Sequence, residues 1–466
     1  MDFDIDHCID RHRAKVCQLA DRIWGYAELK FDEHASSQGH ADCLQAEGFR
    51  VTRGVAGLPT ALLAEYGSGA PVVALLGEYD ALPGMSQVAG ENEPNALQPD
   101  AGGHGCGHHL LGGGSLLAAL ALKNAIEAGA VSGTLRYYGC PAEEGGSGKT
   151  FMVREGLFDD VDVALTWHPD SFNGVSTFDN LANLQACFRF EGRASHAAIA
   201  PHLGRSALDA VELMNVGSNY LREHMPPQAR VHYAITDSGG RAPGVVQARA
   251  EVLYLLRSGQ MNDVLALFER VKKIAEGAAL MTETAMSWQF DRAASSVLGN
   301  RALETLLQTC LERVGGAQVD EQDLAEAVAF RRTFTAQAIE SGFTDLGLMP
   351  DDSALHAGVV PLAEQRQLIY ASSDVGDVSR VVPTGQVYMA CYAIGTGFHS
   401  WQMVAQGKAA FAHKGMVQAA KVLAYAAYEL FMHPSKLLAI KEEFTTASTR
   451  DPYRNPIPKD VTPAIQ

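Results

Sequence analysis

Three short apolar runs, each followed closely by acidic or metal-binding side chains, constrain the fold of this chain more than any other feature. They span residues 72–77, 133–139 and 161–167. Uninterrupted apolar runs of this length are typical of strands that are buried on both faces of a sheet. The pair Glu143-Glu144 follows the second run, and His168 ends the third. Because open α/β sheets bind ligands at the carboxyl ends of their strands, we predict an α/β fold with a site at that edge.

The composition is that of a globular protein and argues against two classes of partner. The 37 basic and 54 acidic residues give a net charge of −17, which disfavours a nucleic-acid-binding surface. No apolar run approaches the roughly 20 residues that span a bilayer, so we expect no membrane partner. The acidic amino terminus lacks the layout of a secretory signal, and the eight cysteines include no CxxC pair. We therefore expect a cytoplasmic protein with reduced thiols.

The region from 184 to 294 differs in character, and we predict that it forms a separate unit. Strand-like runs and amphipathic helices occur there in the order β-α-β-β-α-β, which is typical of a ferredoxin-like α+β module. The region carries no cluster of metal-binding residues. A chain of 466 residues exceeds the size at which one core stops growing, so two domains are expected. The other domain would comprise residues 1–183 and 295–466.

The segment 102–109, Gly-Gly-His-Gly-Cys-Gly-His-His, places one thiol and three imidazoles among glycines that allow tight bends. One glycine separates Cys106 from His108, so a sharp loop can present both side chains to one centre. Thiolate, imidazole and carboxylate groups bind divalent transition metals. The alternative is a glycine-rich loop that caps the next helix and carries incidental polar residues. We interpret His104 as structural.

The two adjacent glutamates are candidates for different tasks. Neighbouring carboxylates repel, so one of them is usually neutralised by a metal or a proton. Assigning Glu144 to a metal leaves Glu143 to take a proton from a metal-activated water. Five ligands are too many for one catalytic zinc and suit two metals roughly 3.5–4 Å apart that share a water. The predicted ligands are Cys106, His108, Glu144, His168 and His399.

Several motifs occur in an order that resembles one enzyme family. They are Gly77-Glu78-Tyr79-Asp80-Ala81-Leu82-Pro83, HGCGHH from His104, PAEEGGSGK from Pro141, TWHP from Thr166 and GTGFHSWQ from Gly395. Together they resemble the metallo-aminoacylase and carboxypeptidase family, and within it the branch of the aminobenzoyl-glutamate hydrolase B subunits. The resemblance covers nearly the whole chain.

The resemblance implies a fold and a set of roles. The fold would be a mixed-sheet catalytic domain with two metals, interrupted by a ferredoxin-like domain that acts in dimerisation or as a lid. Each protomer would hold two divalent cations, with manganese or zinc expected. The family's general base matches Glu143, and Asp80 would orient a metal ligand. His196 matches the histidine that reaches the site of the other protomer and stabilises the oxyanion.

Three further positions bear on the substrate. Arg257 matches the arginine that holds the substrate carboxylate, a task that suits a guanidinium fork; a plain strand end is the alternative. Gly244 stands where the family commonly has an asparagine that touches substrate. His109 stands where the family commonly has aspartate or asparagine, so we expect it to change the surroundings of the ligands.

The resemblance therefore predicts a homodimeric, metal-dependent amidohydrolase of N-acyl or N-aroyl amino acids. An aroyl-glutamate such as p-aminobenzoyl-glutamate is the expected substrate, attacked by a metal-bridging hydroxide with Glu143 as base. Two alternatives stay open: an aminohydrolase that releases ammonia from a small aromatic or amide, and a non-catalytic partner subunit that kept the fold. A related second subunit is a further partner to consider. A closed, structural zinc site is poorly served by ligands spread from Cys106 to His399.

Overall fold

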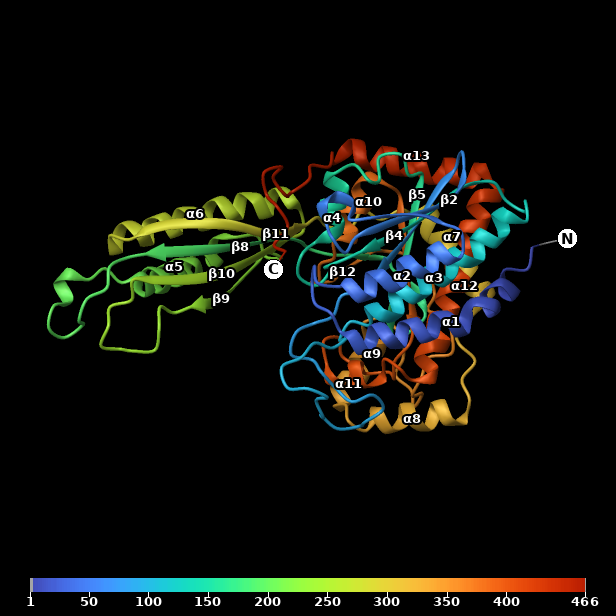
Figure 1. Ribbon diagram of the computed structural model, residues 1–466, viewed down its shortest axis with the longest axis horizontal. Coiled ribbons are helices and arrows are strands. Elements are labelled where there is room, and N and C mark those ends of the chain that lie inside the picture. The colour runs from blue at the N-terminus through green and yellow to red at the C-terminus, as the bar shows by residue number, and fades with distance from the viewer. Residues whose placement is uncertain (1–2, 466) are drawn as a thin grey trace.

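The computed structural model describes residues 3–465 as two units. The larger unit is a sheet covered by helices, and the narrower one projects from its side (Figure 1). The chain enters the narrow unit at Ala182 and leaves it at Ala294. Residues on both sides of this segment build the larger unit, so the narrow unit is an insertion.

The larger unit contains a seven-stranded sheet in the order β1-β2-β4-β3-β5-β13-β6. Its strands are β1 (Arg50–Arg53), β2 (Leu62–Ser68), β3 (Val72–Glu78), β4 (Gly133–Cys140), β5 (Val163–Asp170), β6 (Gly174–Val175) and β13 (Thr384–Ala390). The neighbours β4, β3, β5 and β13 are parallel, whereas β1, β2 and β6 are antiparallel to their partners. The predicted mixed sheet is confirmed. Its four parallel strands end at one edge, which gathers the loops that follow them.

Helices cover both faces of this sheet. One face carries α1 (Ile5–Tyr26), α2 (His34–Ala46), α3 (His108–Glu127), α7 (Arg301–Val314), α12 (Ala410–Met432) and α13 (Pro434–Arg450). The other face carries α4 (Gly148–Arg154) and α10 (Val375–Val381). The helices α8 (Glu321–Arg331), α9 (Ala336–Thr344) and α11 (Trp401–Gln406) and the strand pair β7 (Phe178–Asp179) and β12 (Gln367–Leu368) complete the unit. By length and composition α3 could cross a membrane, but 83% of its apolar window is buried, as expected of a core helix.

The narrow unit contains a four-stranded antiparallel sheet in the order β11-β8-β10-β9. Along the chain its elements are β8 (Ala182–Glu191), α5 (Ala207–Leu221), β9 (Arg230–Asp237), β10 (Arg249–Ser258), α6 (Met261–Thr282) and β11 (Ala285–Ala294). This is the predicted β-α-β-β-α-β order with ferredoxin-like pairing. The strand β8 runs away from the larger unit, so the loop after Glu191 lies at the far tip (Figure 1).

Three predicted boundaries differ from the structure. Residues 8–50 carry helical periodicity in the sequence, and they form two helices because the backbone turns left-handed at Ala27 with φ 45°. The sequence pattern also predicts a closing strand over 281–290, but the strand starts later because α6 continues to Thr282 and ends at Glu283 with φ 51°. The strand β5 extends to Asp170 through its pairing with β13, so His168 lies inside the strand and not after it.

Candidate metal centre

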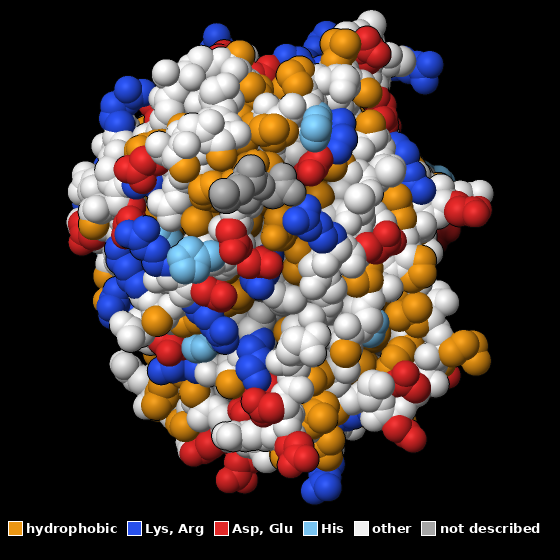
Figure 2. Space-filling model, turned by 90° about the vertical axis from the view of Figure 1, so that its right-hand side faces the viewer, with side chains coloured by type: hydrophobic (Ala, Val, Ile, Leu, Met, Phe, Trp, Pro, Cys, Tyr) orange, Lys and Arg blue, Asp and Glu red, His pale blue; other side chains and the backbone are white. Residues whose placement is uncertain are grey.

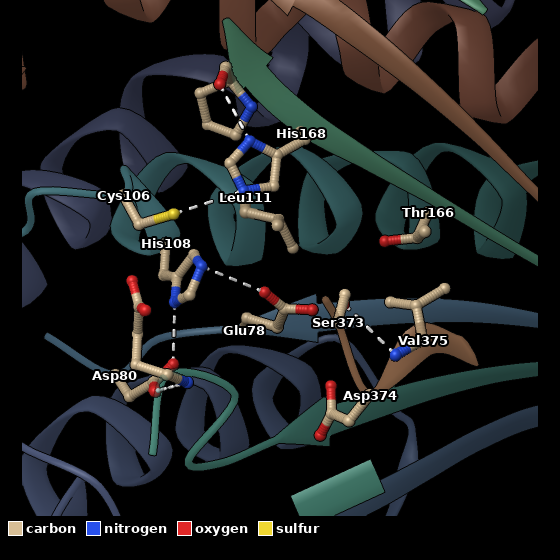
Figure 3. Close-up of polar contacts among 12 residues, drawn as sticks. Glu78, Asp80, Cys106, His108, Leu111, Thr166, His168, Ser373, Asp374 and Val375 are labelled. Atoms are coloured by element: carbon tan, nitrogen blue, oxygen red, sulfur yellow. Dashed lines mark hydrogen bonds and ion pairs between the residues drawn. The ribbon is translucent and has the colours of Figure 1, made fainter. Parts of the chain in front are cut away.

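The predicted ligands come from four places that meet at the carboxyl edge of the parallel strands, and Figure 3 shows Cys106, His108 and His168 there. His168 lies near the end of β5, and Glu144 follows β4. Cys106 and His108 lie where the chain enters α3, and Gly107 between them has φ +79°, a conformation that favours glycine. His399 follows β13 and its backbone N–H donates to the carbonyl of Gly105 at 2.8 Å. The sheet topology therefore assembles residues that are far apart along the chain.

The five predicted ligands form two groups that share Cys106. In the first group, ligand atoms of Cys106, His108 and His168 lie within 4.8 Å of one another. The second group joins Cys106 to Glu144 and His399 within the same limit. The Cys106 Sγ lies 3.5 Å from His168 Nε2, and Glu144 Oε1 lies 3.3 Å from His399 Nε2. Two three-residue groups that share a ligand fit two neighbouring cations.

Hydrogen bonds orient two histidine rings so that one ring nitrogen of each faces the predicted metal centre. The Nδ1–H of His108 donates to Asp80 Oδ1 at 2.7 Å, and that of His168 donates to the carbonyl of Pro169 at 2.9 Å. Each bond leaves Nε2 facing the centre, where a cation would take the place of a proton. The buried atoms His108 Nε2 and Glu144 Oε1 make no hydrogen bond among the described residues, although Glu78 Oε2 and His399 Nε2 lie 3.3 Å from them. These residues fit a divalent metal site.

The thiol of Cys106 supports the same conclusion. Burial raises the pKa of this thiol well above its usual range, and the Glu144 carboxylate adds to the shift. A thiol in such surroundings becomes a thiolate only with a cation beside it. Cysteine and histidine ligands suit zinc and related transition metals.

Asp80 occupies the place that the resemblance implies. One oxygen of its carboxylate binds His108, and Oδ2 accepts the backbone N–H of Glu144 at 2.9 Å. Burial lowers the pKa of His108, but Asp80, Cys106 and Glu78 outweigh it and raise that pKa well above its usual value. Asp80 therefore orients one predicted ligand by its side chain and a second by its backbone.

The structure places Glu143 and Glu144 in different environments. Burial raises the pKa of both carboxyls, but contacts with His399 and His108 reverse the effect and lower the pKa of Glu144. For Glu143, burial together with Glu78, Asp374 and Glu144 outweighs the opposing effect of His108 and raises its pKa well above the usual carboxyl range. Two carboxyls with opposite shifts can perform different tasks, one as ligand and one as proton carrier.

A buried ionic cluster behind the ligands was missed from the sequence. Lys149 Nζ lies 2.6 Å from Glu78 Oε1 and 2.7 Å from Asp374 Oδ1, and all three side chains are buried. Glu78 Oε2 lies 3.3 Å from His108 Nε2, which joins the cluster to the centre (Figure 3). Glu78 ends β3 two positions before Asp80, so its position was a usable signal. Nothing local indicated that Lys149 and Asp374 would meet.

The side chain of His109 points away from the predicted ligands. Its Nε2–H donates to the carbonyl of Gly407 at 2.8 Å, and its ring packs on that of His104 at 4.8 Å. Consecutive residues of a helix point in different directions, so His108 faces the centre while His109 faces the start of α12. His104 binds the carbonyl of Ile23 at 3.0 Å, which agrees with a structural role.

A cavity of about 490 Å³ opens onto the centre. Cys106, Glu143, Glu144, His168 and His399 line one end of it. Arg257 lines it as well, and aromatic side chains contribute Phe178, Tyr370, Tyr388 and Phe398. The cavity therefore offers metal-binding groups, apolar rings and a guanidinium to one ligand.

The structure does not bring His196 and Gly244 to this cavity. His196 is exposed and pairs with Val245, and the carbonyl of Gly244 accepts the Ala197 N–H at 2.9 Å. His196 lies in the segment after β8, and Gly244 lies in the segment after β9. Both segments lie at the tip of the narrow unit (Figure 1). Within one chain they are remote from the predicted ligands.

Known proteins resemble this chain over most of its length. The B subunit of p-aminobenzoyl-glutamate hydrolase from Escherichia coli is 48% identical over 471 residues, which covers 99% of this chain and 98% of the relative. An Xaa-Arg dipeptidase of Mus musculus is 28% identical over 94% of this chain and 90% of its own length.

Solved structures share the fold. An aminobenzoyl-glutamate utilization protein from Klebsiella pneumoniae has a TM-score of 0.61 at 18% identity, covering 91% of this chain and 98% of its own. A dinuclear metal binding peptidase of Bacillus subtilis has a TM-score of 0.55 at 16% identity, covering 91% and 99%. The model of peptidase family M20/M25/M40 matches residues 74–357, which include most of the predicted ligands and the inserted unit. The chain belongs to the peptidase family M20/M25/M40.

Proposed function

We propose that this protein is a metal-dependent amidohydrolase that cleaves the amide bond of N-acyl or N-aroyl amino acids, with an aroyl-glutamate such as p-aminobenzoyl-glutamate as substrate. The observation that carries this proposal is Cys106 shared between two ligand groups at the end of a cavity that also holds Glu143. The 48% identical relative, named as part of a p-aminobenzoyl-glutamate hydrolase, supports the choice of substrate.

Five residues would hold two divalent cations, manganese or zinc: Cys106, His108, Glu144, His168 and His399. When bound, such cations polarise a carbonyl group and make a water molecule more acidic. The chain itself supplies orientation, because Asp80 fixes His108 and the backbone at Glu144. The carbonyl of Pro169 fixes His168 in the same way.

Glu143 is the residue that moves protons. Its carboxylate takes a proton from the attacking water, a carbon–oxygen bond forms at the amide carbon, and Glu143 then delivers that proton to the leaving nitrogen as the carbon–nitrogen bond breaks. Burial, with further effects of Glu78, Asp374 and Glu144, raises the pKa of Glu143, which makes its carboxylate a stronger base for that proton. The products are a carboxylic acid and a free amino acid.

The test is the substitution Glu143→Gln in metal-loaded protein. We expect kcat for p-aminobenzoyl-glutamate to fall by about 10²–10⁴-fold, the usual contribution of a positioned base, while the metal content stays at the wild-type level. Metal content is measured by atomic emission, and amine and ammonia release are scored separately. Glu155→Gln, on the exposed surface, is the matched control.

Two outcomes would contradict the proposal. Full activity in the metal-loaded Glu143→Gln protein would remove Glu143 from the reaction. Release of ammonia without a free amino acid would favour the aminohydrolase alternative.

We further propose that the protein acts as a homodimer that pairs through the narrow unit. The outer face of α5 exposes Leu213, Val216 and Tyr220, with Tyr220 at 74% exposure. These residues share one face of the helix because they are three and four positions apart. The neighbouring strand β9 is an edge of its sheet and exposes Tyr233 and Ile235. An apolar helix face beside an open strand edge favours self-pairing.

The homodimer gives His196 a role that one chain cannot. At the tip of the narrow unit His196 would reach the partner's centre and stabilise the oxyanion there. A related second polypeptide is another partner to test, since the A subunit of p-aminobenzoyl-glutamate hydrolase from Escherichia coli is 28% identical over 46% of this chain.

A further inference from the structure

The cavity holds two guanidinium groups that no carboxylate of the described residues neutralises. Arg257 Nη1 donates to Ser372 Oγ at 2.8 Å, and Arg292 Nη1 donates to the backbone carbonyl of Glu144 at 2.9 Å. Both side chains line the cavity and are half-buried. Burial lowers the pKa of Arg257, and the positive charge of Arg292 lowers it further. Two like charges are thus held near each other without an internal counterion, which is costly unless a ligand supplies it.

The sheet of the narrow unit places both arginines on one face. On β10, Arg257 pairs with Asn183 of β8, and on β11, Arg292 pairs with Gln185 of β8. Paired residues of antiparallel strands project to the same side, and so do residues two apart on one strand. Arg257 and Arg292 therefore flank β8 on the side that faces the cavity.

A β-bulge makes this placement possible for Arg292. The register of β11 against β8 shifts between Phe290 and Arg292. With the register of residues 285–290 continued, Arg292 would pair with Leu184, a core residue that is 1% exposed. The extra residue, Asp291, brings Arg292 to the cavity side instead. Bulges beside functional sites commonly re-aim a side chain in this way.

A third polar group lies between the two arginines. Asn183 lines the cavity, is 4% exposed, and its Oδ1 has no hydrogen-bond partner among the described residues. A buried amide oxygen without a partner is costly, so it indicates a group that arrives with a ligand, such as an amide or ammonium N–H. The cavity therefore offers two guanidinium groups to two anionic groups of a ligand. Between them, Asn183 Oδ1 can accept a hydrogen bond from the ligand.

We propose that Arg257, Arg292 and Asn183 form a dicarboxylate subsite that selects substrates whose amino acid carries a second carboxylate. This inference rests on the proposed amide hydrolysis and deepens it. Arg292, tied to the carbonyl of the predicted ligand Glu144, binds the α-carboxylate next to the scissile bond. Arg257, supported by Ser372, binds the side-chain carboxylate. Each pair is a charge-assisted, fork-shaped contact.

The test compares N-(4-aminobenzoyl) derivatives of glutamate, glutamine and alanine as substrates of the metal-loaded enzyme. We expect kcat/KM for the glutamate compound to exceed that for the glutamine compound by about 10²-fold or more, because a site built for a polar group rejects an analogue that lacks it. Glutamine matches glutamate in shape, so this ratio isolates the second charge.

Two variants distinguish the roles of the two arginines. In Arg257→Met the glutamate-to-glutamine ratio should fall below about tenfold, because the variant no longer offers a cation to the second carboxylate. In Arg292→Met, KM should rise for all three compounds together, because they share the α-carboxylate. Arg189→Met is the control: Arg189 belongs to β8 but is exposed and paired with Glu251 at 2.6 Å.

Binding supplies a readout that does not depend on turnover. By calorimetry, glutarate should bind the metal-loaded enzyme more tightly than butyrate, and Arg257→Met should remove the difference. Hydrolysis of all three compounds at similar rates, with equal binding of glutarate and butyrate, would overturn the subsite and leave the amidohydrolase intact. Hydrolysis of none of them, with glutarate still preferred, would overturn the proposed reaction and leave the subsite standing.

Discussion

Some side chains in this protein contact more than one residue of the predicted metal centre. Asp80 is the clearest case, because its two oxygens contact His108 and the backbone of Glu144. A residue of this kind sets the direction of ligands without touching the cation. Its loss should therefore appear in metal affinity before it appears in folding.

The prediction at this scale is that Asp80→Asn weakens metal binding by about 10–100-fold, the usual effect of removing a group that orients a ligand. Asparagine keeps the shape but offers one acceptor oxygen where aspartate offers two, and it removes the negative charge beside His108. Competition with a chelator measures the affinity, and Asp42→Asn, on the surface, is the control. An unchanged affinity in Asp80→Asn would show that His108 needs no such support.

The types of the reacting residues were predictable, but their partners were less so. Cys106, His108 and the glutamate pair were identified because thiolate, imidazole and carboxylate groups bind divalent transition metals. Arg292 was missed, because only the pairing of β11 with β8 reveals which way it points. The contacts of His109 with Gly407 and His104 were not evident from the sequence, since sequence neighbours on a helix face different directions.

At the scale of elements, Glu33 joins the start of α2 to the loop that carries Glu143. Its Oε1 accepts the backbone N–H of Ala142 at 2.8 Å, and its Oε2 accepts the hydroxyl of Thr60 at 2.7 Å. Burial, with a further effect of Asp80, raises the pKa of Glu33 to about 8. The folded protein therefore keeps a proton on Glu33 that the unfolded chain releases at lower pH.

This shift predicts how stability depends on pH. The pKa of Glu33 is higher in the folded protein, about 8, than in the unfolded chain, near 4.5. The free energy of unfolding therefore decreases as the pH rises from about 4.5 to about 8, and the contribution of Glu33 is smallest above pH 8. In Glu33→Gln this loss should be absent, so the free energy of unfolding of the variant relative to wild type should rise between about pH 6 and pH 8.5. Urea unfolding at both pH values measures it. Parallel pH profiles for the two proteins would contradict the shift.

Most elements follow from local patterns, and their irregularities do not. Apolar runs predicted β3 and β4 nearly to the residue, and the alanines and leucines from Leu110 to Ala128 predicted the helix that the structure places at His108–Glu127. The break at Ala27, the extension of β5 through His168 and the bulge at Asp291 depend on contacts with distant segments. Local periodicity contains no information about those contacts.

The predicted metal centre lies in the larger unit, whereas His196 lies at the far tip of the narrow unit (Figure 1). On the end of the larger unit opposite the narrow one, acidic and basic side chains are intermixed, with no extended basic area among the described residues of that face (Figure 2). This agrees with the net charge of −17. The exposed apolar face of α5 lies on the narrow unit instead, where we propose that two chains meet.

For the whole molecule, we predict that two inactive variants restore activity when they pair in one dimer. If His196 serves the partner's centre, His196→Ala and Glu143→Gln damage different parts of the same composite site. Co-expressed chains should form hybrid dimers with one intact site, and random pairing gives roughly a quarter of the wild-type activity. Two affinity tags isolate the hybrid, and ultracentrifugation confirms the dimer mass. No recovery in isolated hybrids, or a monomeric wild-type protein, would contradict the shared site.

The sequence by itself determined which candidate residues the chain offers and their order: predicted metal ligands, an acidic pair predicted to divide two tasks, and an inserted ferredoxin-like unit. Side-chain identity and periodicity carry this information locally. Only the tertiary structure decided that Lys149 pairs with Glu78 and Asp374, that Arg257 and Arg292 share a cavity, and that His196 lies apart from the centre. Those relations arise from strand pairing and packing between segments far apart in the chain, and burial makes them strong because water no longer screens the charges.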